Sequence, residues 1–164
     1  MTTETYRLNA GVVVFNREGK VLLCRRSDEV EDAWQFPQGG IEKDETPQQA
    51  AKRELYEETS ITNVKWVKTL SEPVKYRFPP KVLAKTHSLG WKHVGQNMYW
   101  SLFYFTGTDT EINLNTAEQE FNAYRWGTLQ EAYDLIVDFK KEVYAVAKNQ
   151  FTDLIAEYVK NLKG

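Results

Sequence analysis

Residues 39–61 read GGIEKDETPQQAAKRELYEETSI and contain the pattern that decides the fold. Thr46 followed by Pro47 predicts the start of a helix, because Thr caps free backbone amides and Pro is favoured at the first helical position. Gln49 stands three residues after Thr46 and can complete a capping box. We therefore expect a helix that begins at this pair and continues to about Thr59.

The acidic residues of this helix share one face. Glu54, Glu57 and Glu58 stand at positions i, i+3 and i+4, which brings all three carboxylates to the same side. Like charges at this spacing cost roughly a few tenths of a kcal/mol per pair, so helix stability alone does not favour them. A hard divalent cation such as Mg²⁺, which takes oxygen ligands, would offset the repulsion. The other interpretation is a solvated acidic face with Lys52 and Arg53 as partners.

The spacing of the whole stretch resembles the signature of the Nudix hydrolases. Gly39 is followed after five residues by Glu45, after seven more by RELYEE at 53–58, and after one more by Ser60 and Ile61. The signature has Gly at the position of Ser60, the one fixed position that differs. The difference affects the turn after the helix, where Gly usually adopts a left-handed backbone and Ser does so at some cost.

This resemblance implies metal-assisted hydrolysis of a phosphoanhydride. Mg²⁺, with Mn²⁺ as a substitute, would be held by Glu54, Glu57 and Glu58, with Gly39 at the same metal site. Such a metal polarises phosphoryl oxygens and lowers the pKa of a bound water, which then attacks phosphorus at neutral pH. Arg53 is expected either to orient the carboxylates by ion pairing or to form a purely structural salt bridge.

Two segments before the helix narrow the resemblance to one branch of the family. WQFPQGG at 34–40, and Tyr6-Arg7 followed by Asn9 and Gly11, resemble the bacterial RNA 5′-pyrophosphohydrolases and the plant-type diadenosine tetraphosphate hydrolases. The resemblance implies that Arg7 and Gln38 bind substrate. Without the resemblance, the paired glycines would predict only a turn.

Apolar, β-branched runs at 10–15 and 21–24 predict two strands joined by a tight turn at 16–19. Arg25 and Arg26 follow the second strand directly. They are either surface charges at a strand end or anion clamps at a phosphate site, since Arg contacts phosphate oxygens in a bidentate manner.

Further strands are expected at 64–71 and 74–78, and a basic segment without acidic residues covers 75–93. This segment indicates an anionic partner, and the alternative is a solvated loop. Tyr76, which lies among cations, suits base stacking. Gln96 is predicted in a loop before a buried strand at 99–106, and the branch resemblance implies that it contacts substrate.

The last part of the chain supplies one more candidate carboxylate. The E-F…W pattern of Glu120, Phe121 and Trp126 resembles that of the branch and makes Glu120 the predicted fourth carboxylate, as metal ligand or general base, with Glu118 as the nearby alternative. A last strand is expected around 124–126.

Two helices are expected between residues 129 and 162, the second beginning near Asp138, because apolar residues recur there at helical spacing. Phe139 and Lys140 at their junction resemble the substrate-binding residues of the branch.

The length, the strand pattern and the net charge of the chain lead to the remaining expectations about its fold and partners. The chain has 164 residues, which favours a single domain over residues 1–164, and strands without a regular βαβ series predict an α+β fold. The resemblance sharpens this to a Nudix α/β/α sandwich, with a mixed sheet and a loop–helix–loop at the signature. A net charge of −2 does not favour DNA binding.

The only cysteine, Cys24, is predicted to be a core residue and fits a reducing compartment. The first residues show no apolar leader and no stretch predicts a membrane span, so we expect a cytoplasmic protein without a membrane partner.

The resemblance implies two substrate classes, dinucleoside polyphosphates such as diadenosine tetraphosphate and the 5′-triphosphate end of RNA. Both place a base next to a polyphosphate. Two alternatives are a hydrolase of modified nucleoside triphosphates and a non-catalytic nucleotide-binding module, and the intact R-E-x-x-E-E run argues against the second.

Overall fold

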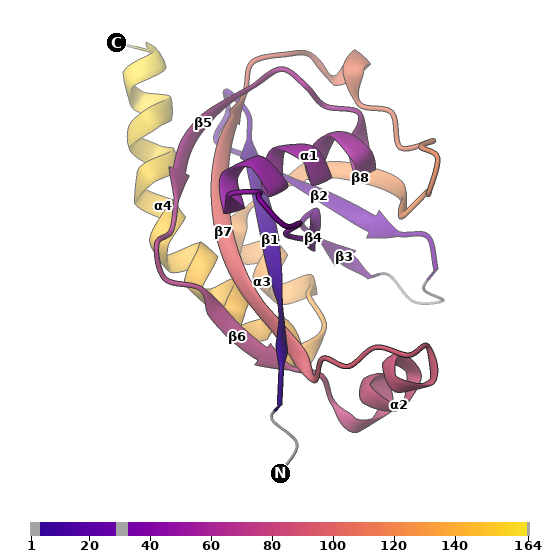
Figure 1. Ribbon diagram of the computed structural model, residues 1–164. Helices are drawn as coiled ribbons and strands as arrows, with labels where there is room; N and C mark the ends of the chain where they lie inside the picture. Colours follow the sequence, from indigo (N-terminus) through magenta and orange to yellow (C-terminus); the bar gives the residue numbers. More distant parts are fainter. Residues whose placement is uncertain (1–3, 29–32, 164) are drawn as a thin grey trace.

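A computed structural model describes residues 4–28 and 33–163 of the chain. Residues 1–3, where the N-terminal stretch considered above begins, lie outside the described residues. The expected α+β fold is confirmed, and helices cover both faces of a mixed sheet (Figure 1). Among the described residues, no helix is both long and apolar enough to cross a membrane.

Eight strands of the described chain form one sheet, whose central path runs β3-β2-β1-β7-β5. Of the remaining strands, β4 pairs with β1, β6 with β7 and β8 with β2. The bounds of the strands are β1 Tyr6–Phe15, β2 Val21–Arg26, β3 Trp34–Gln35, β4 Gln38–Gly40, β5 Val64–Thr69, β6 Val74–Arg77, β7 Gly95–Phe105 and β8 Phe121–Gly127.

The two long central strands, β1 and β7, run parallel, with residues 6–15 opposite residues 95–104. All other pairings are antiparallel among the described residues, so the sheet is mixed as expected. The turn between β1 and β2 contains Gly19, whose φ of 77° requires the left-handed region that glycine tolerates.

Helix α1 (Pro47–Thr59) covers one face of the sheet. Its Ala50, Ala51 and Leu55 pack against Ala10 and Val12 of β1 and their neighbours in one apolar cluster. Cys24 belongs to this cluster and is fully buried, as predicted. These apolar contacts therefore fix the position of α1, and of its acidic face, relative to β1 and β4.

The opposite face is covered by α3 (Leu129–Leu135) and α4 (Lys141–Lys163), which are joined by the 3₁₀ turn η2 (Asp138–Lys140). Val13 and Phe15 of β1 point to this side and pack with Tyr144 and Phe151 of α4. Alternate residues of β1 thus contribute to two separate cores, as the two-residue period of a strand requires.

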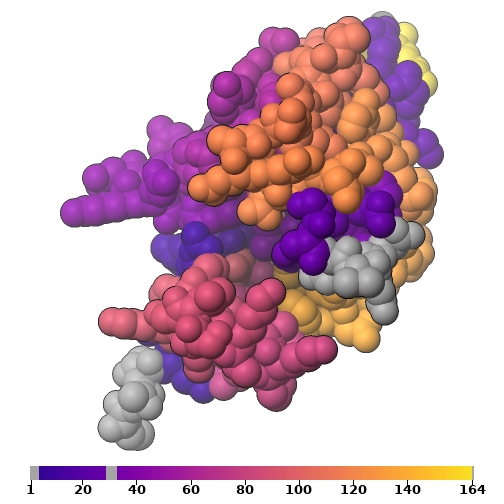
Figure 2. Space-filling view, turned by 90° about the vertical axis from the view of Figure 1, so that its right-hand side faces the viewer, coloured from indigo at the N-terminus to yellow at the C-terminus, as the bar shows by residue number. Residues whose placement is uncertain are grey.

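Two local expectations differ from the structure. The basic segment at 75–93, for which no helix was predicted, contains the helix α2 (Pro80–Ser88), and no residue of this helix is buried. Figure 2 shows the segment around α2 as a lobe that projects from the body of the protein. Strand β7 begins at Gly95, so Gln96 lies in a strand and not in the expected loop. A short 3₁₀ turn, η1 (Asp109–Glu111), lies in the segment after β7.

Candidate active site

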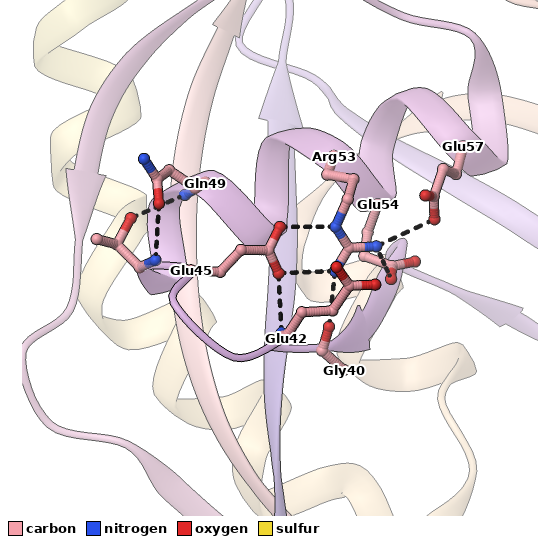
Figure 3. Close-up of polar contacts among 8 residues, drawn as sticks. Gly40, Glu42, Glu45, Gln49, Arg53, Glu54 and Glu57 are labelled. Carbon is pink, nitrogen blue, oxygen red and sulfur yellow. Dashed lines mark hydrogen bonds and ion pairs between the residues drawn. The ribbon is translucent and has the colours of Figure 1, made fainter.

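Helix α1 begins and ends where its sequence predicts. The hydroxyl of Thr46 accepts a hydrogen bond from the backbone amide of Gln49 at 3.1 Å. The side-chain oxygen of Gln49 accepts one from the backbone amide of Thr46 at 2.9 Å (Figure 3). Ser60 ends the helix with φ 68°, and its amide donates to the carbonyl of Tyr56 at 2.8 Å. The serine thus adopts the left-handed cap in place of the glycine of the signature.

Arg53 joins this helix to the loop before it (Figure 3). Its guanidinium donates to both carboxylate oxygens of Glu45, at 2.7 and 2.9 Å, and to the carbonyl of Gly40 at 2.8 Å. It also donates to Glu54 at 2.7 Å and to Glu57 at 3.1 Å. The expected ion pairs are present, and they lower the pKa of the Glu45 carboxyl.

Glu58 is the most deeply buried of the carboxylates, with 8% of its surface exposed. Its Oε2 has no hydrogen-bond partner among the described residues. Burial raises the pKa of Glu58 well above its ordinary value, and the charges of Glu54 and Glu120 raise it further. The backbone amide of Gln38 acts in the opposite direction. The buried carboxylate of Glu58 therefore lies among other negatively charged side chains.

Glu54 is partly buried, and its carboxylate lies against Gly39. A Cβ placed on Gly39 would meet the Cδ of Glu54 at 2.0 Å, and both carboxylate oxygens at 2.3 Å. Burial raises the pKa of Glu54, and the hydrogen bond from Arg53 acts against that rise. Position 39 thus brings backbone into direct contact with a carboxylate of the acidic face.

A cavity of about 500 Å³ opens beside these carboxylates. It lies between the second half of α1 and the segment that leads into β8, and both acidic candidates of that segment face it. The lining residues include Glu54, Glu57, Glu58, Glu118 and Glu120. The structure therefore gathers the four predicted carboxylates around one cavity.

Glu120 is fixed through its backbone. Its carbonyl accepts the amide of Ser27 at 2.9 Å and the hydroxyl of Ser27 at 3.0 Å, which ties the start of β8 to the end of β2. Glu120 and Glu58 line the same cavity, and the charge of Glu120 adds to the burial that raises the pKa of Glu58.

The donor set around the cavity consists of carboxylate oxygens, the ligands that hard divalent cations prefer. The partnerless buried oxygen of Glu58 is an acceptor of the kind that a cation would satisfy. In the described residues no three acidic, histidine or cysteine side chains already converge as a ready metal site. In this conformation Arg53 donates hydrogen bonds to Glu54 and Glu57, which accounts for the separation between these carboxylates.

Five of the predicted substrate-binding residues form a second, mostly uncharged network. The Tyr76 hydroxyl donates to Oε1 of Gln96 at 2.9 Å, and the same oxygen lies 3.5 Å from the amide nitrogen of Gln38. Nζ of Lys140 lies 3.5 Å from Oε1 of Gln38 and 5.7 Å from the centre of the Tyr76 ring. Phe139 packs against Tyr76 with ring centres 5.9 Å apart. Strands and turns distant in sequence thus bring these residues together.

The stacking role expected for Tyr76 does not fit its position. The residue is only 6% exposed, and its ring also contacts Phe78 in the core. Burial raises the pKa of the Tyr76 hydroxyl to about 12. In this conformation Tyr76 therefore contributes a hydrogen-bond donor, and a base has no free face of its ring to stack on.

Arg7 lies between a glycine and an exposed aromatic ring. Its guanidinium carbon is 5.3 Å from the centre of the Trp91 ring, and a Cβ on Gly40 would meet its Nη2 at 2.2 Å. Burial raises the pKa values of both Glu54 and Tyr76, and the charge of Arg7 acts against both rises, so this guanidinium lies between the acidic face and the Tyr76 network.

Arg25 and Arg26 end strand β2 and are partly buried. Arg26 donates to both carboxylate oxygens of Asp28, at 3.0 and 2.7 Å, which lowers the pKa of that acid. Its charge also acts against the burial that raises the pKa of Tyr76. Arg26 therefore shares the side of the molecule on which Arg7 and the Tyr76 network lie.

Two residues near the site were missed by sequence reasoning. Trp91 was one of several residues in the basic segment, and only the fold shows its contact with Arg7. Tyr144 was given no role from the sequence, and its hydroxyl accepts a hydrogen bond from the amide of Phe36 at 2.9 Å. That bond fixes the chain directly before β4, and no local pattern in the sequence could have indicated it.

Comparison with known proteins agrees with this geometry. A model of the NUDIX domain family matches residues 5–147. An RNA pyrophosphohydrolase of Caulobacter vibrioides is 44% identical over 142 residues, which cover 85% of this chain and 81% of that protein. An RNA pyrophosphohydrolase of Bartonella bacilliformis is 38% identical over 164 residues, which cover 93% of this chain and 95% of that protein.

Solved structures with a similar fold are more distant in sequence. A binary complex of the Ap4A hydrolase of C. elegans has a TM-score of 0.64 at 20% identity, covering 92% of this chain and 98% of that one. The dihydroneopterin triphosphate pyrophosphohydrolase of E. coli has a TM-score of 0.61 at 21% identity, covering 96% and 99%. At these identities the likeness concerns the fold.

Proposed function

The chain belongs to the Nudix hydrolase family, and from that membership and the acidic cavity we propose that it is a Mg²⁺-dependent pyrophosphohydrolase of triphosphorylated RNA 5′ ends. Dinucleoside polyphosphates such as diadenosine tetraphosphate are the second substrate class. The observation that carries the proposal is the buried, partnerless carboxylate of Glu58, which lies beside other carboxylates where a cation would be stabilised.

Glu54, Glu57, Glu58 and Glu120 are the residues that would hold the cation, close to the backbone of Gly39. Bound there, a divalent cation would neutralise charge on the phosphate oxygens and acidify a water for attack on phosphorus. This chemistry accounts for an acidic face that is costly in the metal-free protein.

Arg53 would position the carboxylates. It already donates to Glu54 and Glu57, and Glu45 holds the guanidinium in place from the other side. A planar guanidinium with several donors suits such bridging, because its bonds to carboxylates are directional.

Glu120 would be either an additional ligand or the group that accepts a proton from the attacking water. It faces the cavity, it is exposed to solvent, and it interacts with Glu58. An exposed carboxylate keeps access to bulk water, to which it can pass a proton.

Arg7, Arg25 and Arg26 would bind the polyphosphate, because guanidinium groups contact phosphate oxygens in a bidentate manner. The neighbouring network would bind the nucleoside part. Of its members, Gln38 and Phe139 are partly exposed, whereas Tyr76, Gln96 and Lys140 lie beneath the surface.

Among the candidate substrates we rank triphosphorylated RNA first, because the relatives at 38–44% identity over most of the chain are named RNA pyrophosphohydrolases. The Ap4A hydrolase is similar at 20% identity, which supports the fold and not a shared substrate. Hydrolysis of modified nucleoside triphosphates is a second candidate, because a cation held at the acidic cavity would act on any phosphoanhydride.

A competition assay tests the proposal. Triphosphorylated RNA and diadenosine tetraphosphate are offered at equal concentration with Mg²⁺, with Ca²⁺ or with EDTA. We expect faster turnover of RNA with Mg²⁺, poor turnover with Ca²⁺, which prefers more ligands at longer distances, and none with EDTA. Equal rates with EDTA and with Mg²⁺ would rule out the metal mechanism, and a preference for mononucleotides over both substrates would favour the second candidate.

A further inference from the structure

The charge of the chain is unevenly distributed along its length. Residues 73–108 contain five Lys and Arg and no Asp or Glu. Because the chain as a whole carries −2, the remaining residues carry −7. The middle of this basic stretch, residues 75–93, runs from β6 through α2, and we name it the basic lobe because its part around α2 projects from the body of the protein in Figure 2.

Four lysines of the basic lobe are exposed, and one of them, Lys75, packs against an aromatic ring of β1. Lys81, Lys85 and Lys92 are exposed, and none forms an ion pair with another residue that the structure describes. Arg77 differs, because Glu4 neutralises it at 2.7 Å. Like charges gathered without partners repel one another, so an anion that binds there gains their combined attraction.

The basic lobe also exposes apolar side chains. Trp91 is 40% exposed and Leu89 is 66% exposed. Val82 and Leu83 of α2 pack, partly buried, against the core, whereas neither Leu89 nor Trp91 belongs to an apolar cluster of the described residues. An exposed ring beside lysines is the combination that binds single-stranded nucleic acid, in which bases stack and phosphates pair with cations.

The basic lobe is continuous with the candidate active site. Trp91 stacks on Arg7, and Arg7 lies against Gly40 at the start of the loop before α1. On another side, the charge of Lys85 lowers the pKa of Asp28, the partner of Arg26. The exposed lysines of the basic lobe therefore lie next to Arg7 and Arg26, two of the arginines that are predicted to bind phosphate.

We propose that the basic lobe binds the single-stranded RNA that follows the 5′ triphosphate. The inference rests on the proposed function for its choice of RNA. The triphosphate lies at the acidic site with Arg7 and Arg26, the next bases reach Trp91, and the following phosphates reach Lys81, Lys85 and Lys92. A dinucleoside polyphosphate carries no phosphate beyond its second nucleoside, so the lysines of the lobe would distinguish RNA from the smaller substrates.

The test compares two triple variants of equal charge. Lys81→Ala, Lys85→Ala and Lys92→Ala are combined in one protein. Lys65→Ala, Lys68→Ala and Lys160→Ala are combined in the control, where the lysines are also exposed but lie on β5 and α4. Binding of a 15-nucleotide single-stranded RNA with a 5′ hydroxyl is measured by fluorescence anisotropy, which needs no catalysis.

We expect the lobe variant to bind this RNA about tenfold more weakly at low salt, with the slope of log K against log salt smaller by about 0.7 for each lysine removed. The control should bind like the wild type. Equal affinity of the wild type and the lobe variant would overturn the proposal, as would an equal loss in the control.

Turnover separates the inference from the proposed function. The lobe variant should lose about tenfold in kcat/KM on a triphosphorylated 15-nucleotide RNA and nothing on diadenosine tetraphosphate. An equal loss on both substrates would contradict the inference. A wild type that hydrolyses diadenosine tetraphosphate but not triphosphorylated RNA would contradict the RNA function, while the anisotropy result would still decide whether the lobe binds RNA.

Discussion

The carboxylate of Glu54 occupies the space that a side chain on Gly39 would need. A Cβ on Gly39 would lie 2.0 Å from Cδ of Glu54. The φ of Gly39 is not positive, so the backbone itself would accept another residue. The requirement for glycine at this position therefore comes from the neighbouring carboxylate and not from the conformation of the chain.

Gly39→Ala is expected to inactivate the protein without unfolding it. The added methyl group must displace the Glu54 carboxylate, and a displacement of about 1 Å near a reacting centre can cost roughly 10²-fold in rate. Turnover of triphosphorylated RNA and the melting temperature are measured together. The control is Gly19→Ala in the turn between β1 and β2, where φ is 77° and the new Cβ would make only ordinary contacts at 3.7 Å, so backbone strain lowers stability while turnover is retained. Full activity of Gly39→Ala would show that Glu54 need not hold its position.

Glu57→Gln is expected to remove most activity. Glu57 is 54% exposed at its side chain and bonds only to Arg53 among the described residues, so the substitution keeps the fold. Losing one carboxylate charge at a metal site should lower kcat by roughly 10³-fold. Steady-state kinetics with a melting curve check the result, and wild-type turnover in a folded variant would refute the assignment.

Glu58→Gln is expected to stabilise the protein in EDTA. Because the folded-state pKa of Glu58 is raised above its ordinary value of 4.5, the folded protein binds more protons than the unfolded chain between those two pKa values. Stability therefore falls as pH rises through that window, and the glutamine variant lacks this loss.

Melting temperatures in EDTA are compared at pH 4.5 and pH 8. The difference between Glu58→Gln and wild type should grow toward pH 8, with about 2–4 °C for each kcal/mol. Glu57→Gln, at an exposed position, should show little change between the two pH values. A Glu58→Gln protein less stable than wild type at pH 8 would contradict the raised pKa.

Glu45→Gln should show the opposite pH dependence. Arg53 lowers the pKa of Glu45 below its ordinary 4.5, so the pair stabilises the fold above pH 4.5 and the contribution is lost as pH falls through the folded-state pKa. Wild type should therefore be more stable than Glu45→Gln at pH 7, and the difference should shrink below pH 4. Chemical unfolding at several pH values measures it, and a constant difference would argue against the ion pair.

Glu120→Gln is expected to lower kcat roughly 10²-fold with little change in KM, because the lost interaction acts mainly in the transition state. Glu118→Gln lines the same cavity and serves as the control with a mild effect. The two variants are compared by kinetics over a range of pH, where loss of a base also changes the acidic limb of the profile. The reverse order of the two effects would reject Glu120.

The sequence predicted those parts of the site that local chemistry determines. Thr46 and Gln49 cap α1 as expected, because capping depends on residues three positions apart. The carboxylates of α1 share a face for the same reason. Glu120, far along the chain, could be placed only by resemblance to a family, and the structure brings it to the cavity.

The parts that sequence reasoning missed depend on tertiary contacts. Helix α2 spans nine residues and packs only Val82 and Leu83, partly buried, against the core, so its apolar pattern is too short to indicate a helix. Tyr76 resembles an exposed stacking residue in sequence, and only the packing of Phe78 and Phe139 against it places it beneath the surface. Gln96 follows a glycine, which suggested a loop, yet its parallel pairing with Arg7 on β1 makes it part of a strand.

The parallel pairing of β1 with β7 also sets the order in which the protein can fold during synthesis. Residue 6 pairs with residue 95, and residue 15 with residue 104, so the centre of the sheet cannot close until β7 has left the ribosome. Contacts between such distant residues slow folding, and unpaired strand edges expose growing chains to aggregation. All residues of helix α1, with its carboxylates, are synthesised long before the sheet that supports the helix can form. A nascent chain stalled before residue 95 would therefore carry the whole signature and still lack an assembled site.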